Sequence, residues 1–171
     1  ESPLSHLKRL PSLLIEGVKA SARRKKKSAR QFGDEAKTLL RGLPEYYQRN
    51  FHFQPDGYLS DLSAELYEHQ VEVLFGGAAD SMRRLIIEPL REHFGSSDGD
   101  GLKFLEVAAG TGRSTSFVRL AFPLAKIVAL DLSAPYLKRA QVNLKSYPRH
   151  DFVEGDAAAT PFRDEEFDAV Y

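Results

Sequence analysis

The sequence contains no cysteine. This absence excludes a disulfide framework, thiolate zinc sites and cysteine nucleophiles within these residues. No apolar run approaches the roughly 20 residues that a membrane-spanning helix needs, and no secretory signal is visible. Together these absences are typical of a cytoplasmic protein, and this is the location that we expect.

The chain also has no formal net charge, because Lys+Arg and Asp+Glu both number 24. A chain-wide attraction to nucleic acid is therefore not indicated, and we expect no specific nucleic-acid partner. One local exception is the basic run ARRKKKSAR at 22–30. A solvated helix face is the simpler interpretation of this run. The alternative is an arm that makes peripheral contact with a membrane or with RNA.

The 171 residues are enough for one domain with a sizeable core. Composition predicts a helical, basic extension at 1–50, a helical lid or cap segment at 51–101, and an α/β segment at 102–171. The first residue is Glu1 rather than Met, and FDAVY at 167–171 has the pattern of a core strand. We therefore expect that the C-terminal strands of the domain are missing from this chain.

Two helices are expected in the lid segment. Ser60 or Asp61 can cap a helix that runs to about Phe75 and is ended by Gly76-Gly77. Asp80 can cap a second helix at 81–94, in which Pro89 predicts a kink or an early end.

Strands and helices alternate from Leu102 onward. Ser133 is a candidate cap for the second helix. Alternation of this kind predicts an α/β fold, namely a doubly wound, mostly parallel Rossmann-like sheet with helices on both faces. Ligands of such sheets bind beyond the carboxyl ends of the strands. The predicted strands are 103–107, 126–130, 150–155 and 167–171, and the predicted helices are 113–122 and 133–147.

Three features fall at successive strand ends. In FLEVAAGTGRS (104–114), Gly110 and Gly112 permit a tight turn and close approach of a ligand. Asp131 ends the second strand, where a carboxylate suits ribose hydroxyls. Asp156, followed by the small Ala157, ends the third and suits an adenine amino group. Each feature alone is also typical of an ordinary turn or cap, but their conjunction predicts a nucleotide-like cofactor.

FLEVAAGTGRS, ALDLS and GDAAATPFRDEEFDAVY resemble class I, Rossmann-like S-adenosylmethionine-dependent methyltransferases. The last segment is similar to the branch that methylates small molecules, including the quinone and sterol C-methyltransferases. The resemblance covers 102–171 well and 1–101 only weakly. It implies S-adenosylmethionine as the cofactor and a small-molecule methyl acceptor. The binding residues that it implies are Glu106, Ala108, Gly110, Gly112, Asp131, Leu132, Asp156 and Ala157.

Those residues take different parts in the resemblance. Glu106 orders the loop and the methionine amino group, and residues 108–112 lie beside the methionine moiety. Asp131 corresponds to the ribose-binding acid, Leu132 packs on adenine, and Asp156 with Ala157 contacts adenine. Phe162 is expected near the cofactor edge.

The sequence departs from the family pattern at two places. Ala108-Ala109 stands where other small pairs are usual, and Arg113 stands where glycine is frequent. Arg113 could reach a carboxylate or point to solvent.

No catalytic residue can be assigned from the sequence. The five histidines lack metal-ligand spacing, so no metal is expected. His52 and His69 are weak candidates for a general base. Tyr58 and Tyr67 could touch cofactor or substrate, although core packing is the more ordinary use of such aromatic residues. The acceptor, the atom that is methylated and the oligomeric state stay open.

Two other functions are compatible with parts of the sequence. A nicotinamide-dependent oxidoreductase would show G-x-G-x-x-G, but the third glycine position is Thr115. A non-catalytic cofactor-binding domain with a basic arm for membrane or RNA is the second alternative.

Overall fold

The computed structural model describes residues 57–171 and, before them, residues 11, 15, 18, 37, 40 and 42–48. The chain divides into two compact units, Glu1–Phe75 and Gly76–Tyr171. The basic run 22–30 and His52 lie outside the described residues, and the three-part division at residues 50 and 101 stays a prediction. No helix in the described part of the chain is long and apolar enough to cross a membrane.

The first unit contains the short 3-10 helix η1 (Glu45–Tyr47) and helix α3 (Asp61–Leu74). Ser60 is the predicted N-cap, because the Ser63 N–H donates to Ser60 Oγ at 3.1 Å. Helix α3 ends just before the predicted Phe75. Tyr58 and Tyr67 pack edge to face with ring centroids 6.0 Å apart, so aromatic packing accounts for both.

The second unit begins with two short helices, α4 (Ala79–Arg84) and α5 (Ile87–Phe94), where the sequence predicts one helix with a kink or an early end. Pro89 is the third residue of α5, and its ring excludes a continuous helix through the preceding turn. The predicted cap is wrong. Ala78 is the N-cap of α4, and Asp80 lies in the first turn, where its carboxylate binds arginine side chains.

Four parallel strands follow in the order β3-β2-β1-β4. They confirm the predicted α/β fold with a parallel sheet. Strand β4 is shorter than the predicted 167–171, and its Val170 is 61% exposed, so this strand is less buried than the sequence predicts. The strands are β1 (Lys103–Val107), β2 (Lys126–Asp131), β3 (His150–Glu154) and β4 (Ala169–Val170); helices α6 (Arg113–Ala121) and α7 (Ala134–Asn143) connect the first three.

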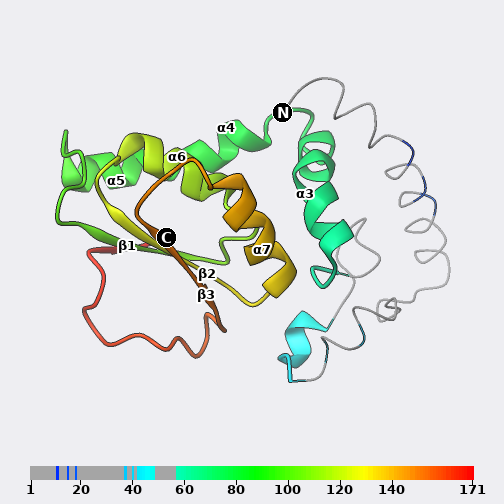
Figure 1. Ribbon diagram of the computed structural model, residues 1–171. Helices are drawn as coiled ribbons and strands as arrows, with labels where there is room; N and C mark the ends of the chain where they lie inside the picture. Colours follow the sequence, from blue (N-terminus) through cyan, green and yellow to red (C-terminus); the bar gives the residue numbers. More distant parts are fainter. Residues whose placement is uncertain are drawn as a thin grey trace. The chain divides into compact units, whose positions relative to one another are not determined.

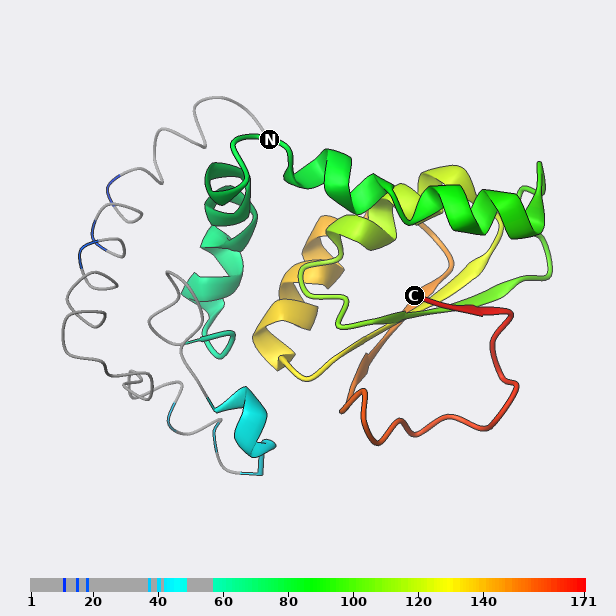
Figure 2. The ribbon, with the colours of Figure 1, turned by 180° about the vertical axis from the view of Figure 1, so that it is seen from behind.

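The two faces of the sheet are covered differently. Helices α5, α6 and α7 lie on one side, and the segment 155–168 crosses the other (Figures 1 and 2). The helix-covered face holds the cluster of Leu90, Phe104, Val118, Phe122, Ala125 and Ile127. The opposite face holds Leu105, Val128 and Leu130, against which Phe162 and Phe167 pack. Within the described residues, a loop therefore covers the face on which the sequence predicts further helices.

Candidate functional site

The loop 108–112 joins the end of β1 to the start of α6. The Ala109 N–H donates to the Leu130 carbonyl at 3.0 Å, which ties the loop to β2. Asn143 of α7 donates from Nδ2 to the Thr111 carbonyl at 2.9 Å, a contact that the sequence does not predict. Ala108 adopts a left-handed φ of 56°, a backbone region that non-glycine residues rarely occupy. The loop is thus a tight, strained turn at the carboxyl edge of the sheet.

Gly110 and Gly112 both have positive φ, but different surroundings. A Cβ added to Gly112 would lie 2.7 Å from Leu144 Cδ1, so this glycine allows α7 to pack against the loop. A Cβ added to Gly110 would meet nothing nearer than Tyr136 Cδ1 at 3.9 Å. A Cβ at Gly110 would therefore be in ordinary van der Waals contact without a clash, whereas close helix packing explains Gly112.

Asp131 is the last residue of β2 and is 8% exposed. Its Oδ2 accepts from the Gly110 N–H at 2.8 Å, and its Oδ1 accepts from the Ser133 N–H at 2.7 Å. The Asp131 carbonyl also accepts from the Gly155 N–H at 3.0 Å. This one residue connects the ends of β1, β2 and β3. Carboxylate oxygens are acceptors of the kind that ribose hydroxyls require.

Glu106 of β1 is 4% exposed and lies on the face of the sheet that α6 covers. Tyr171 donates from its hydroxyl to Glu106 Oε2 at 3.3 Å. Burial raises the pKa of the Glu106 carboxyl to about 7, although the neighbouring polar groups of Thr115 and Tyr171 act in the opposite direction. Burial also raises the pKa of the Tyr171 phenol well above its ordinary value, and the nearby Glu106 adds to this effect. At neutral pH, Glu106 is consequently poised between its protonated and ionised forms.

The sequence did not single out Tyr171. Its side chain shares a face with Ala169 through the two-residue alternation of a strand, and both pack against the helix-covered cluster. Only the parallel pairing of β4 with β1 brings Tyr171 to Glu106. The two-residue alternation of the strand could have shown which way the Tyr171 side chain points. It could not have shown that β4 pairs with β1.

The remaining predicted residues follow β2 and β3. Leu132 is half-buried and Ala157 is exposed. Asp156 Oδ1 accepts from the Ala158 N–H at 2.8 Å, so its carboxylate also stabilises a local turn. Phe162 packs edge to face on Phe167, with centroids 4.9 Å apart, on the sheet face away from the helices. Phe162 thus packs against the apolar face of the sheet, and its place near the cofactor edge stays a prediction.

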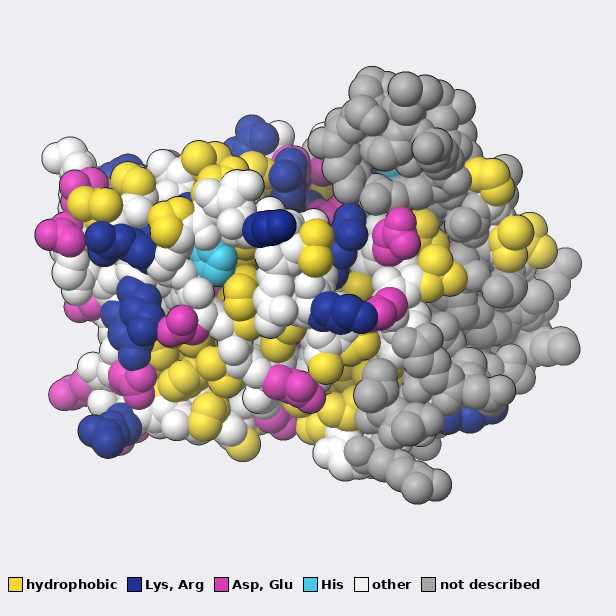
Figure 3. All heavy atoms as spheres, viewed as in Figure 1, with side chains coloured by type: hydrophobic (Ala, Val, Ile, Leu, Met, Phe, Trp, Pro, Cys, Tyr) yellow, Lys and Arg dark blue, Asp and Glu magenta, His cyan; other side chains and the backbone are white. Residues whose placement is uncertain are grey.

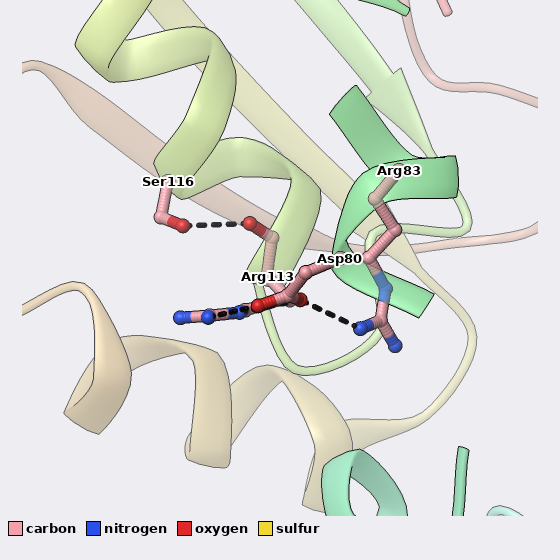
Figure 4. A network of polar contacts seen from close by, with 4 residues as sticks. All are labelled: Asp80, Arg83, Arg113 and Ser116. Atoms are coloured by element: carbon pink, nitrogen blue, oxygen red, sulfur yellow. Dashed lines mark hydrogen bonds and ion pairs between the residues drawn. The ribbon is translucent and has the colours of Figure 1, made fainter. Parts of the chain in front are cut away.

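Arg113, the first residue of α6, reaches a carboxylate, which decides between its two predicted environments. Its Nε donates to Asp80 Oδ1 at 2.9 Å, and its Nη2 donates to Asp80 Oδ2 (Figure 4). Arg83 donates to Asp80 Oδ1 at 3.2 Å. The hydrogen bonds from Arg113 lower the pKa of Asp80 below its ordinary value. A charged pair therefore joins α4 to the helix that begins at the loop.

Residues 104–171 match the protein family described as "Methyltransferase domain". Over these residues the chain is similar to the class I, S-adenosylmethionine-dependent methyltransferases. The match includes all but the first residue of β1, the loop, Asp131 and Asp156, but not Asp80.

Curated relatives of this methyltransferase segment act on small molecules, according to their names. A demethylmenaquinone methyltransferase of Renibacterium salmoninarum is 39% identical over 107 residues, which are 63% of this chain and 40% of the relative. A fatty-acid O-methyltransferase of Mycolicibacterium smegmatis is 32% identical over 94 residues, 54% of this chain and 33% of the relative. The chain therefore spans less than half the length of these relatives.

A solved S-adenosylmethionine-dependent methyltransferase from Aquifex aeolicus also aligns with the chain. Its sequence identity is 17% and its TM-score is 0.41, over 48% of this chain and 45% of that one.

The described residues fit S-adenosylmethionine chemically. The carboxylates of Asp131 and Asp156 are acceptors that suit hydroxyl and amino groups, and glycine at 110 leaves the backbone of the loop without a side chain. Within the described part of the chain, no group of three or more His, Asp or Glu side chains is arranged to hold a metal ion.

Proposed function

We propose that this chain binds S-adenosylmethionine at the carboxyl edge of β1, β2 and β3 and takes part in methyl transfer to an apolar small molecule. The observation that carries the proposal is the bonding of Asp131 to Gly110, Ser133 and Gly155. These contacts preorganise the loop and the ends of three strands before any ligand binds, which reduces the ordering cost of binding.

Each side chain has a distinct part in this proposal. Asp131 accepts from the ribose hydroxyls, while Leu132 packs on the adenine ring. Asp156 and Ala157 meet the adenine edge, and residues 108–112 lie along the methionine moiety. Glu106 accepts a hydrogen bond from Tyr171 and supports the loop from the end of β1. When the Glu106 carboxyl is ionised, it attracts the methionine ammonium group.

Bound S-adenosylmethionine supplies a methyl group on a sulfonium, from which the acceptor's nucleophilic atom takes the methyl while the bonding pair stays on sulfur. The protein's part is to hold the cofactor and acceptor in line and to keep water away. Asp131 fixes one end of the cofactor through hydrogen bonds that do not change during the reaction. Rate enhancement would therefore come mainly from positioning.

A ligand-dependent melting experiment tests this function. S-adenosylmethionine and S-adenosylhomocysteine should raise the melting temperature of the chain, because a ligand that binds only the folded state stabilises it. NAD(H) should leave the melting temperature unchanged. A shift with NAD(H) and none with S-adenosylmethionine would instead favour the oxidoreductase alternative.

The names of the relatives support a quinone or lipid as the acceptor class. Incorporation of labelled methyl from S-adenosylmethionine into a demethylated quinone, compared with a free fatty acid, would decide between them. Product in neither assay would contradict both acceptor classes.

An apolar acceptor is consistent with a cytoplasmic enzyme that touches a membrane surface through residues 22–30. On the face of the molecule in Figure 3, basic and acidic side chains of the described residues are mixed with hydrophobic ones. The run 22–30 concentrates positive charge in the sequence, so binding to anionic vesicles should depend on it. Neutralising Arg23 to Lys27 should abolish a salt-sensitive association, whereas vesicle binding that survives this change would rule the arm out.

A further inference from the structure

The Asp80–Arg113 ion pair connects the cofactor loop to a helix outside the matched family segment. The Arg113 fork makes two hydrogen bonds to one carboxylate, a geometry that fixes the plane as well as the position of the guanidinium group. The Asp80 side chain is only 22% exposed. The Arg113 side chain is 46% exposed, so solvent screens the pair in part and its bidentate geometry is the feature that matters.

A second contact orients the same guanidinium group. Arg113 Cζ lies 4.9 Å from the centroid of the Phe117 ring, one turn along α6. Arg84 of α4 lies 4.7 Å from the centroid of that ring. The carboxylate and the aromatic ring therefore hold Arg113 from two directions.

The backbone of Arg113 is coupled to the cofactor loop. It directly follows Gly112, whose carbonyl accepts from the Ser116 N–H at 3.1 Å. The Ser116 hydroxyl donates to the Arg113 carbonyl at 2.6 Å (Figure 4). A Cβ at Gly112 would lie 2.7 Å from Leu144 Cδ1, so the residue between Arg113 and the rest of the loop is closely packed.

We propose that Asp80 is a positioning residue for the cofactor loop and acts through Arg113. Asp80 does not touch the cofactor in this account. It fixes the first turn of α6, and thereby the backbone of the loop that contains Gly110. The inference rests on the proposed function, because the loop has to be the S-adenosylmethionine site.

The test measures the affinity of the full chain for S-adenosylhomocysteine by calorimetry. Asp80→Asn keeps the shape of the side chain but removes its charge, and Arg113→Lys keeps the charge but removes the fork. Each variant should raise Kd about tenfold, and the double variant should be no worse than the weaker-binding single one, because both remove one interaction. Asp80→Glu should restore most of the affinity.

The control is a second ion pair in the same unit. Lys126 and Asp151 lie 2.9 Å apart on β2 and β3, with both side chains more than half exposed. Asp151→Asn should leave Kd unchanged. Melting temperatures of all variants, measured without ligand, separate loss of affinity from loss of folded protein.

The outcomes are distinguishable. If the wild-type chain binds S-adenosylhomocysteine and folded Asp80→Asn binds equally well, the positioning role is wrong and the proposed function stands. Additive losses in the double variant would also contradict the role. If the wild-type chain does not bind, the proposed function fails, and the positioning role fails with it.

Discussion

The Asp131 carboxylate accepts a hydrogen bond from the Gly110 backbone N–H at 2.8 Å, across the gap between two parallel strands. The acid that the sequence assigns to the ribose thus also holds the loop assigned to the methionine moiety. One side chain therefore couples two parts of the candidate site, and changing it should affect both the loop and the ligand.

Asp131→Ala should weaken binding of S-adenosylmethionine by about 2–3 kcal/mol, since it removes acceptors for the ligand and for the Gly110 N–H. Isothermal titration of the folded variant measures this directly. The matched control is Asp168→Ala, which removes an exposed carboxylate bonded to the Lys103 N–H at the opposite end of β1. Equal affinities for the wild-type chain and Asp131→Ala would refute the assignment of Asp131.

Gly112→Ala should destabilise the fold by about 3 kcal/mol, because its Cβ would collide with Leu144 and its φ of 77° is strained for alanine. Gly110 also has a positive φ, but its Cβ would meet no atom nearer than 3.9 Å, so Gly110→Ala should cost about 1 kcal/mol. For ligand affinity the order should reverse, with the folded Gly110→Ala variant losing more. Urea unfolding measures the two stability costs, and calorimetry measures the two ligand affinities. Equal unfolding costs for the two variants would contradict this prediction.

Ala108→Gly should stabilise the protein by about 0.5 kcal/mol, since relief of the left-handed φ of 56° exceeds the added entropy of the unfolded chain. Ala109→Gly is the control. Ala109 is 7% exposed and is not among the described residues with positive φ, so glycine there should be destabilising. Midpoints of urea unfolding distinguish the two, and destabilisation by Ala108→Gly would show that the alanine side chain contributes packing.

Glu106 predicts a pH dependence of stability. The pKa of its carboxyl is about 7 in the folded chain and 4.5 for an ordinary glutamate, so the folded state binds more protons between these values. The free energy of unfolding should therefore fall by about 3 kcal/mol as pH rises from 4.5 through 7. Glu106→Gln should remove this contribution. Urea unfolding at pH 5 and pH 8 measures the difference, and identical pH profiles for the two proteins would contradict the role of burial.

Local signals were sufficient for much of the fold. The alternation of strand and helix patterns predicted β1, β2 and β3, and the candidate cap Ser133 predicted the start of α7. The structure confirms this cap, because the Tyr136 N–H donates to Ser133 Oγ. Helix α7 ends at Asn143 rather than at 147. Pro148 explains part of that difference, because it disfavours helical backbone at the residue before it.

Tertiary contacts account for what the sequence did not predict. Aspartate is a residue type that often caps helices, which is why the sequence suggested Asp80 as a cap. In the structure its carboxylate instead accepts hydrogen bonds from two arginine side chains. Gly112 is explained by Leu144, a residue 32 positions away, and no local pattern reports such a contact. The same reasoning applies to Tyr171 and Glu106, which meet only through the pairing of β4 with β1.

Isothermal titration of the full chain with S-adenosylmethionine, and in parallel with NADH, tests the central claim most directly. The account predicts saturable binding of S-adenosylmethionine at one site per chain, weakened in Asp131→Ala, and no heat of binding for NADH. Saturable binding of NADH without binding of S-adenosylmethionine would contradict it.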